Sequence, residues 1–194
     1  MADNEHAVPS SRTKLTYEDF LLFPDDGKRH ELIDGEHYVT PSPSSAHQLI
    51  VGNIYYVLRE YLKRRRLGVV MLAPFDIVLS DVDVVEPDLI YFTRECYERV
   101  VGQKNARGAP DLAVEVLSPS TRRNDEVLKR RLYERCRIGE YWVVDPELET
   151  VKVYRLADRT YGRAQELALE RGEALASPLL PDLEVPLGDV FALA

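Results

Sequence analysis

Two short stretches of this chain decide its fold. They are EPDLIYF at residues 86–92 and DLAVEVLSPS at residues 111–120. Each is an apolar run of strand length, bounded by turn-forming residues, with one carboxylate inside it: Asp88 in the first and Glu115 in the second. An ionised carboxylate costs several kcal/mol to bury unless it is paired. We therefore expect the two acids to lie together and to share a positive partner.

Side chains alternate between the two faces of a strand. Asp88 therefore shares a face with Ile90, and Glu115 shares a face with Ala113 and Leu117. If the two strands pair, both carboxylates come within reach of one divalent cation. Mg²⁺ commonly takes one or two protein carboxylates and completes its shell with water and substrate phosphate. Such an ion lowers the pKa of a bound water and stabilises charge on a phosphate.

A lysine downstream supplies a positive charge. A helix is predicted over residues 122–137, where Asp125, Lys129 and Tyr133 follow each other at i, i+4 spacing on one face. Lys129 either pairs with Asp125 for a few tenths of a kcal/mol, or points over the sheet to orient an attacking water and offset phosphate charge. The spacing leaves both open. For the two strand acids, the alternatives to a metal are separate solvation at the strand ends or a salt-bridge network with Lys129.

Five further residues are candidates for the site. Glu31 is either an additional ligand of metal or water, or a charge opposite a basic residue. His47 lies near the start of a predicted helix, where it would bind phosphate or act as a base, although most histidines there do neither. Ser118 and Ser120 first cap the next helix, and backbone N–H groups at its start can meet a phosphate. Arg122 is assigned to substrate binding; its alternative is a solvated helix face.

The rest of the sequence predicts a mixed α/β (α+β) architecture with an N-terminal β-hairpin. Asp34-Gly35 is typical of a type I′ turn, so residues 30–40 form the hairpin. A capping box at Thr16 and Asp19 begins a short helix. A long helix runs from Ser44 or Ser45 to about Arg66, with Gly68 as its C-terminal signal. Strands are expected at residues 69–72, 75–79, 87–92, 112–117, 140–144 and 151–156. We expect them to form one mixed sheet flanked by helices.

Length and composition limit the class of protein. The chain has 194 residues, 30% of them charged, with a net charge of -8. This suits one domain, expected over residues 15–194 behind a flexible arm at residues 1–14. No apolar run reaches the ~20 residues of a membrane helix, and the start lacks the features of a secretory signal. Two distant cysteines indicate reduced thiols, so we expect a cytoplasmic protein without a membrane partner. The acidic charge argues against nonspecific nucleic-acid binding over the whole surface, but local basic clusters can bind phosphates.

Taken together, the segments around these residues resemble the Uma2 family of restriction-endonuclease-like proteins, within the PD-(D/E)XK nuclease superfamily. The matching segments are residues 31–36, 41–43 with 47–48, 86–89, 110–121, Asp125 with Lys129 and Tyr133, and 140–146. They cover most of residues 15–156. The resemblance implies a restriction-endonuclease-like core in which a mixed sheet is flanked by helices.

The resemblance also implies a function and a site. Asp88 and Glu115 would bind Mg²⁺ or Mn²⁺, and Lys129 and Glu31 would complete the catalytic set of a metal-dependent endonuclease acting on DNA. Leu117 stands where the superfamily has lysine, so the lysine would come from the following helix. A homodimer is expected from the superfamily alone. The alternatives are a catalytically silent binding or assembly module, and a carboxylate-pair hydrolase acting on another substrate.

Overall fold

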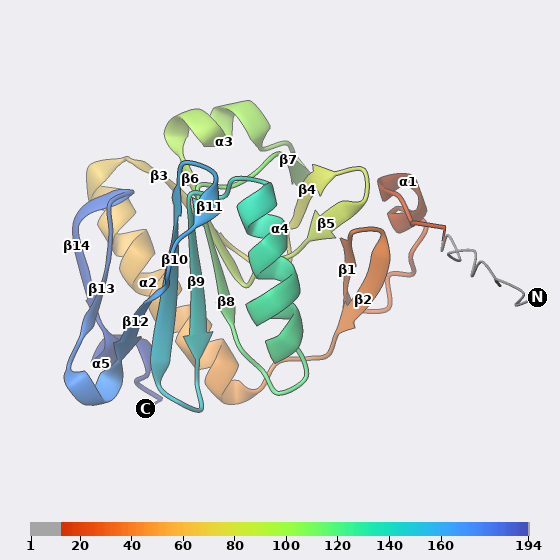
Figure 1. Cartoon of the computed structure of the whole chain (residues 1–194). Coiled ribbons are helices and arrows are strands. Elements are labelled where there is room, and N and C mark those ends of the chain that lie inside the picture. Colours follow the sequence, from red (N-terminus) through yellow and green to blue (C-terminus); the bar gives the residue numbers. More distant parts are fainter. Residues whose placement is uncertain (1–12, 194) are drawn as a thin grey trace, which may run out of the picture.

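The computed structural model describes residues 13–193. Its centre is a seven-stranded mixed sheet in the order β11-β10-β9-β8-β6-β3, with β12 beside β10 (Figure 1). The strands are β3 (Gly68–Leu72), β6 (Leu89–Thr93), β8 (Leu112–Val116), β9 (Glu140–Asp145), β10 (Thr150–Ala157), β11 (Thr160–Tyr161) and β12 (Gln165–Ala168). β8 and β9 are parallel, and the other pairs are antiparallel. Every residue of β8 is buried, as its continuous apolar sequence predicts for a central strand.

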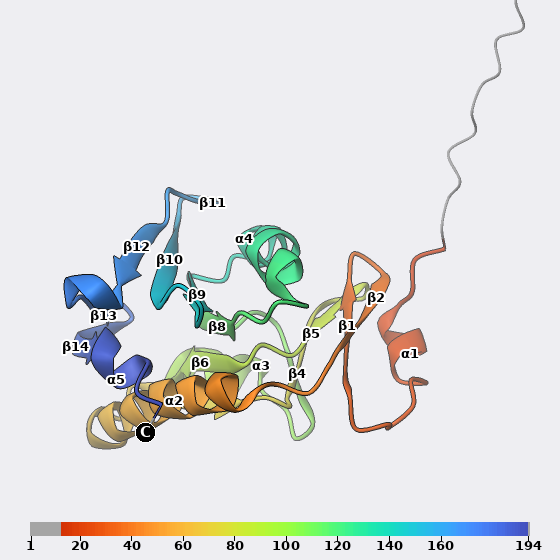
Figure 2. The same cartoon turned by 90° about the horizontal axis from the view of Figure 1, so that it is seen from below.

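Helices cover both faces of this sheet (Figure 2). α2 (Ser45–Arg65) packs on one face, where it meets Val114 and Val116 of β8. The π-helical turn η1 (Asn124–Lys129) continues into α4 (Arg130–Arg135), which packs on the other face against Ala113 and Leu117. The alternation along β8 thus divides the core into two layers, as predicted.

The C-terminal elements extend the layer that contains α2. They are the short 3-10 helix η2 (Leu169–Arg171), the hairpin β13 (Ala174–Ser177) and β14 (Leu180–Pro186), and α5 (Leu187–Val190). Apolar residues of the hairpin and of α5 belong to the same core cluster as α2. They pack beside α2 on the same face of the sheet.

A second, five-stranded sheet carries the N-terminal hairpin, in the order β2-β1-β5-β4-β7. Its strands are β1 (Arg29–Ile33), β2 (Glu36–Thr40), β4 (Asp76–Ser80), β5 (Asp83–Val85) and β7 (Asn105–Arg107). Asp34 and Gly35 both have positive φ, as a type I′ turn requires. Pairing of β1 with β5 places Glu31 beside the segment that leads to Asp88. There a carboxylate oxygen of Glu31 accepts a hydrogen bond from the N–H of Glu86 at 2.8 Å.

Several boundaries differ from the sequence-based expectations. The strand expected at residues 75–79 is β4, which joins the second sheet instead of the main one. β5, α3 (Arg94–Val100) and β7 lie in segments for which no helix or strand is expected from the sequence. Gly68 does not end α2: the left-handed cap is Arg66. A Cβ on Gly68 would lie 2.0 Å from the carbonyl oxygen of Phe92, so glycine is required there for close strand pairing.

The capping box of Thr16 and Asp19 is confirmed and begins α1 (Tyr17–Phe20). Most of the arm predicted at residues 1–14 lies outside the described residues. At its described end, Lys14 Nζ lies 2.5 Å from a carboxylate oxygen of Asp34 in the hairpin turn. Within residues 13–193, none of the helices has the length and apolar character needed to cross a membrane.

Candidate active site

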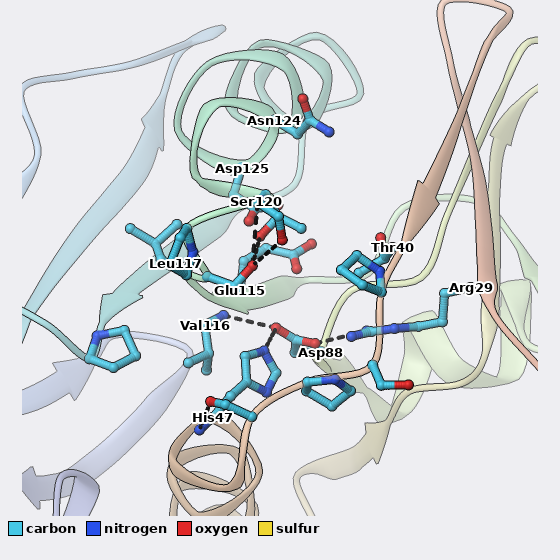
Figure 3. Close-up of a pocket in the computed structure, with 18 of the residues that line it drawn as sticks. Arg29, Thr40, His47, Asp88, Glu115, Val116, Leu117, Ser120, Asn124 and Asp125 are labelled. Atoms are coloured by element: carbon cyan, nitrogen blue, oxygen red, sulfur yellow. Dashed lines mark hydrogen bonds and ion pairs between the residues drawn. The ribbon is translucent and has the colours of Figure 1, made fainter.

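The pairing of β6 with β8 brings the two strand acids together. The strands are antiparallel, with Leu89 opposite Val114. Continuing this register by one residue places Asp88 opposite Glu115. Both side chains line a cavity of about 520 Å³ at this end of the sheet (Figure 3). The prediction that the acids meet is therefore confirmed in its geometry.

Asp88 is held by three hydrogen-bond donors. Arg29 Nη1 lies 2.8 Å from Oδ1, while His47 Nε2 at 3.0 Å and the N–H of Val116 at 2.9 Å meet Oδ2. Burial alone would raise the pKa of Asp88, but His47, Arg29 and Val116 lower it to about 2. Asp88 is therefore an anion at neutral pH.

Glu115 lies against the ammonium of Lys129. Its Oε1 accepts hydrogen bonds from Lys129 Nζ at 3.0 Å and from the Tyr133 hydroxyl at 2.8 Å. Lys129 Nζ also lies 2.9 Å from Glu31 and 3.7 Å from Asp125. Burial would lower the pKa of Lys129, but the surrounding acids raise it well above its usual value. The ammonium therefore stays charged, and it contacts Glu31 and Glu115 across the site as well as Asp125 on its own helix.

Carboxyl groups outnumber permanently charged cations in and beside this cavity. Five buried carboxyl groups form what we call the acid cluster: Glu31, Glu86, Asp88, Glu115 and Asp125. Two side chains that carry a permanent positive charge, Arg29 and Lys129, contact the cluster.

Three members of the acid cluster have raised pKa values, mainly because they are buried and also because other acids lie near them. Burial raises the pKa of Glu86 to about 7, with Asp76 and Glu31 adding to the effect. Burial raises the pKa of Asp125 to about 6 against the opposing effect of Lys129, and it raises the pKa of Glu115 well above the usual value. Because bound cations displace protons from such groups, the cluster is suited to take up further positive charge.

The donor set fits a magnesium-type ion that keeps most of its water. Among residues 13–193, no three His, Cys, Asp or Glu side chains form a ready-made metal cage. Mg²⁺ needs only one or two carboxylates. Asp88 is ionised, and the hydrogen bonds that Glu115 receives from described residues fall on Oε1, which leaves Oε2 for a ligand. Asp88 and Glu115 are thus the residues that could hold the ion.

The remaining predicted residues are distributed unevenly. Glu31 and His47 lie in the site, and the alternative for Glu31, a charge opposite a basic residue, is also realised. Ser118 and Ser120 line the cavity, with their hydroxyl oxygens 3.1 Å apart. Arg122 does not line it: its guanidinium binds Asp145 at 2.6 and 3.1 Å.

Sequence reasoning missed Arg29 and Glu86. Arg29 lies two residues before Glu31 on β1, so both side chains leave the same face of the strand. Glu86 lies two residues before Asp88, and its Oε2 is buried without a hydrogen-bond partner among the described residues. Because side chains two residues apart on a strand share a face, the spacing of Arg29 from Glu31 and of Glu86 from Asp88 could have predicted that both lie near the site.

Comparisons with known proteins identify a family and a fold. The sequence model of the family "Uma2: Putative restriction endonuclease" matches residues 17–188. A crystal structure from Anabaena variabilis, described as "a putative nuclease belonging to DUF820", superposes with a TM-score of 0.78 at 21% identity, covering 92% of this chain and 98% of that one. This likeness shows the fold. No curated protein matches. Since the family model spans most of the chain, the protein belongs to the Uma2 family.

Proposed function

We propose that the protein is a metal-dependent endonuclease that hydrolyses DNA phosphodiester bonds with Mg²⁺ or Mn²⁺. Its family and its solved structural neighbour are both described as nuclease-like. The observation that carries the proposal is the position of Lys129. Its ammonium reaches Glu115 from a different element than the strand that carries the acid, inside a cavity shared with Asp88.

Each residue of the site has a distinct role in this proposal. Asp88 and Glu115 would hold the metal, which supplies a more acidic water and stabilises charge on the phosphate. Arg29 and His47 fix the orientation of Asp88 through its two oxygens. A metal ligand that is already oriented by hydrogen bonds loses less side-chain conformational entropy when it binds the ion.

Lys129 and Glu31 act on the water. The ammonium donates to the attacking water and offsets charge that develops on the phosphate. The water oxygen forms the new bond to phosphorus, and a proton of the water passes to Glu31, which lies 2.9 Å from the ammonium. The bond between phosphorus and the sugar oxygen breaks, and the departing sugar oxygen takes a proton from solvent water. Ser118 and Ser120 line the cavity where the substrate phosphate would approach.

Cleavage of DNA tests the proposal. Purified wild type is incubated with plasmid and oligonucleotide DNA in Mg²⁺, Mn²⁺ or EDTA, beside Asp88→Asn, Glu115→Gln and Lys129→Met. Glu98→Gln, on the exposed side of α3, is the matched control. We expect each site variant to lose at least ~100-fold in rate, with EDTA abolishing cleavage. Full metal-dependent cleavage by Asp88→Asn and Glu115→Gln would overturn the assignment.

The rival is a silent module that keeps the fold. In that case the contacts of Lys129 would only neutralise the acids, and neither Mn²⁺ binding nor cleavage would be found. Self-association is a separate proposal, tested by sedimentation of the wild type: a dimer at micromolar concentration supports it, and a monomer contradicts it.

A further inference from the structure

The cavity is poor in free positive charge. Arg29 and Lys129 are the lysine and arginine side chains among its described lining residues, and buried acids bind both. Arg122, just outside, is bound to Asp145. Arg123 is exposed next to it. An intact duplex carries a negative charge about every 1.7 Å along its axis, and proteins that bind it release counterions through many lysine and arginine contacts. This lining offers no such set.

The basic cluster of residues 63–66 does not supply the missing charge. It lies at the C-terminal end of α2, whereas His47 lies in the first turn. At about 1.5 Å per residue, the two ends of this helix are about 30 Å apart. The cluster therefore cannot contact a nucleotide whose phosphate lies at Asp88.

The cavity has the size and walls of a site for one nucleotide. Its volume of about 520 Å³ falls within the range of about 300–1,000 Å³ for pockets that bury small ligands. The walls come from the segments 40–44, 117–121 and 146–147, and they contain four prolines: Pro41, Pro43, Pro119 and Pro146. Proline rings are apolar and fix the backbone, so these walls are suited to hold the flat face of a base or sugar.

Asn124 provides a polar group for the edge of a base. It lines the cavity from the first position of η1, next to Asp125 (Figure 3). It is half-buried, and its amide makes no hydrogen bond to the described residues. An asparagine amide offers one acceptor and two donor hydrogens. Adenine is the base whose edge matches this pattern in a bidentate pair.

We propose that the cavity takes a single unpaired nucleotide, and that the substrate is single-stranded DNA or an unpaired segment of a duplex. This inference rests on the proposed function and names its substrate class. The phosphate lies at Asp88 and Glu115, the base lies between the proline walls, and Asn124 reads its edge. An intact duplex would have to extrude a nucleotide first, which costs a few kcal/mol.

Matched oligonucleotides test the inference. One sequence is prepared as a single strand, as a perfect duplex and as a duplex with a central unpaired bubble. Binding to wild type is measured by fluorescence anisotropy in Ca²⁺, and cleavage is measured in Mn²⁺. We expect the single strand and the bubble to be bound, and cleaved, at least ~10-fold better than the duplex.

The outcomes separate the two proposals. Equal or better binding of the duplex, or no binding of any DNA, overturns the inference. Selective binding of unpaired DNA without any cleavage overturns the nuclease activity and supports the substrate class.

A second variant tests the role of Asn124. Asn124→Ala is compared with Gln103→Ala, an exposed amide outside the cavity. We expect the Asn124 variant to lose about tenfold in affinity for oligo-dA, in line with one bidentate base contact. It should bind oligo-dT as wild type does and melt at the same temperature. Unchanged affinity for oligo-dA would remove Asn124 from the site.

Discussion

Replacing Lys129 by methionine removes the central cation of the site while keeping most of its apolar stem. The side chain of Lys129 is only 5% exposed, and its ammonium lies 2.9 Å from Glu31 and 3.0 Å from Glu115. Removing one partner of a buried ion pair costs about 3–5 kcal/mol, because the other charge is left buried without compensation. We expect a loss of this size in the free energy of unfolding at neutral pH.

The loss must depend on pH, and the sign follows from the acids. Burial already raises the pKa of Glu115 and Asp125, and Lys129 opposes this rise. In the variant both acids keep their protons in the folded state, whereas the unfolded chain releases them above about pH 4. Each such acid lowers the stability of the variant by about 1.4 kcal/mol per pH unit, until the pH passes its folded-state pKa. The cost of the substitution is therefore smaller near pH 5 than near pH 7.5.

Urea unfolding measures this directly. Trp142 is the single tryptophan of the chain and is fully buried, so its fluorescence reports global unfolding. Lys63→Met is the matched control, because that side chain is 69% exposed and its one ion pair within residues 13–193 is with Glu60 at 3.8 Å. The reasoning is refuted if Lys129→Met costs less than about 1 kcal/mol, or if its cost is the same at both pH values.

Three further substitutions probe the surroundings of Lys129. Asp88→Asn should lower the free energy of unfolding by about 2 kcal/mol at pH 7, because the pKa of Asp88 is lowered to about 2 in the folded protein. In urea unfolding this difference from wild type should disappear as the pH falls from about 4 to 2. A difference that stays constant over this range would contradict the prediction. Glu86→Gln should stabilise the protein by about 3 kcal/mol at pH 8 and by nothing near pH 4.5, because burial raises the pKa of Glu86 to about 7 and ionisation of that carboxyl above pH 4.5 favours the unfolded wild type. Urea unfolding measures the difference, and destabilisation at pH 8 would show that the carboxylate has an essential partner. Arg122→Gln should lower the free energy of unfolding by about 1 kcal/mol, because the guanidinium of Arg122 binds Asp145. Its affinity for single-stranded DNA should stay within about twofold of wild type. A larger loss of affinity would place Arg122 in the substrate site.

The sequence was sufficient to place Asp88 and Glu115. Alternation along a buried strand is a local rule, and it assigned both acids and their apolar neighbours to the correct faces. The turn at Asp34-Gly35 and the cap at Ser44 were also predictable, because each depends on the conformation of one or two residues.

Contacts between distant segments were not predictable in the same way. The partition of strands into two sheets depends on which edges meet, and the sequence of β4 is compatible with either sheet. Arg122 and Arg29 show the same limit. Both arginines lie near predicted site segments. Arg122 pairs with Asp145, 23 residues away, and Arg29 pairs with Asp88, 59 residues away.

The π-helical turn is a further feature that helical spacing did not predict. η1 places Asn124, Asp125 and Lys129 along the cavity, whereas the sequence suggested an ordinary α-helix from residue 122. Single π turns occur preferentially at functional sites. The turn η1 lies where the backbone directs both the Lys129 ammonium and the Asn124 amide toward the cavity.

Binding of Mn²⁺ tests the central claim, that Asp88 and Glu115 form a metal site, most directly. Isothermal titration calorimetry at neutral pH compares wild type with Glu115→Gln and with the exposed control Glu98→Gln. The account predicts binding to wild type and to the control, with protons released because raised-pKa acids ionise, and loss of binding in Glu115→Gln. Equal binding by all three proteins, or no binding by wild type in the presence of single-stranded DNA, would contradict it.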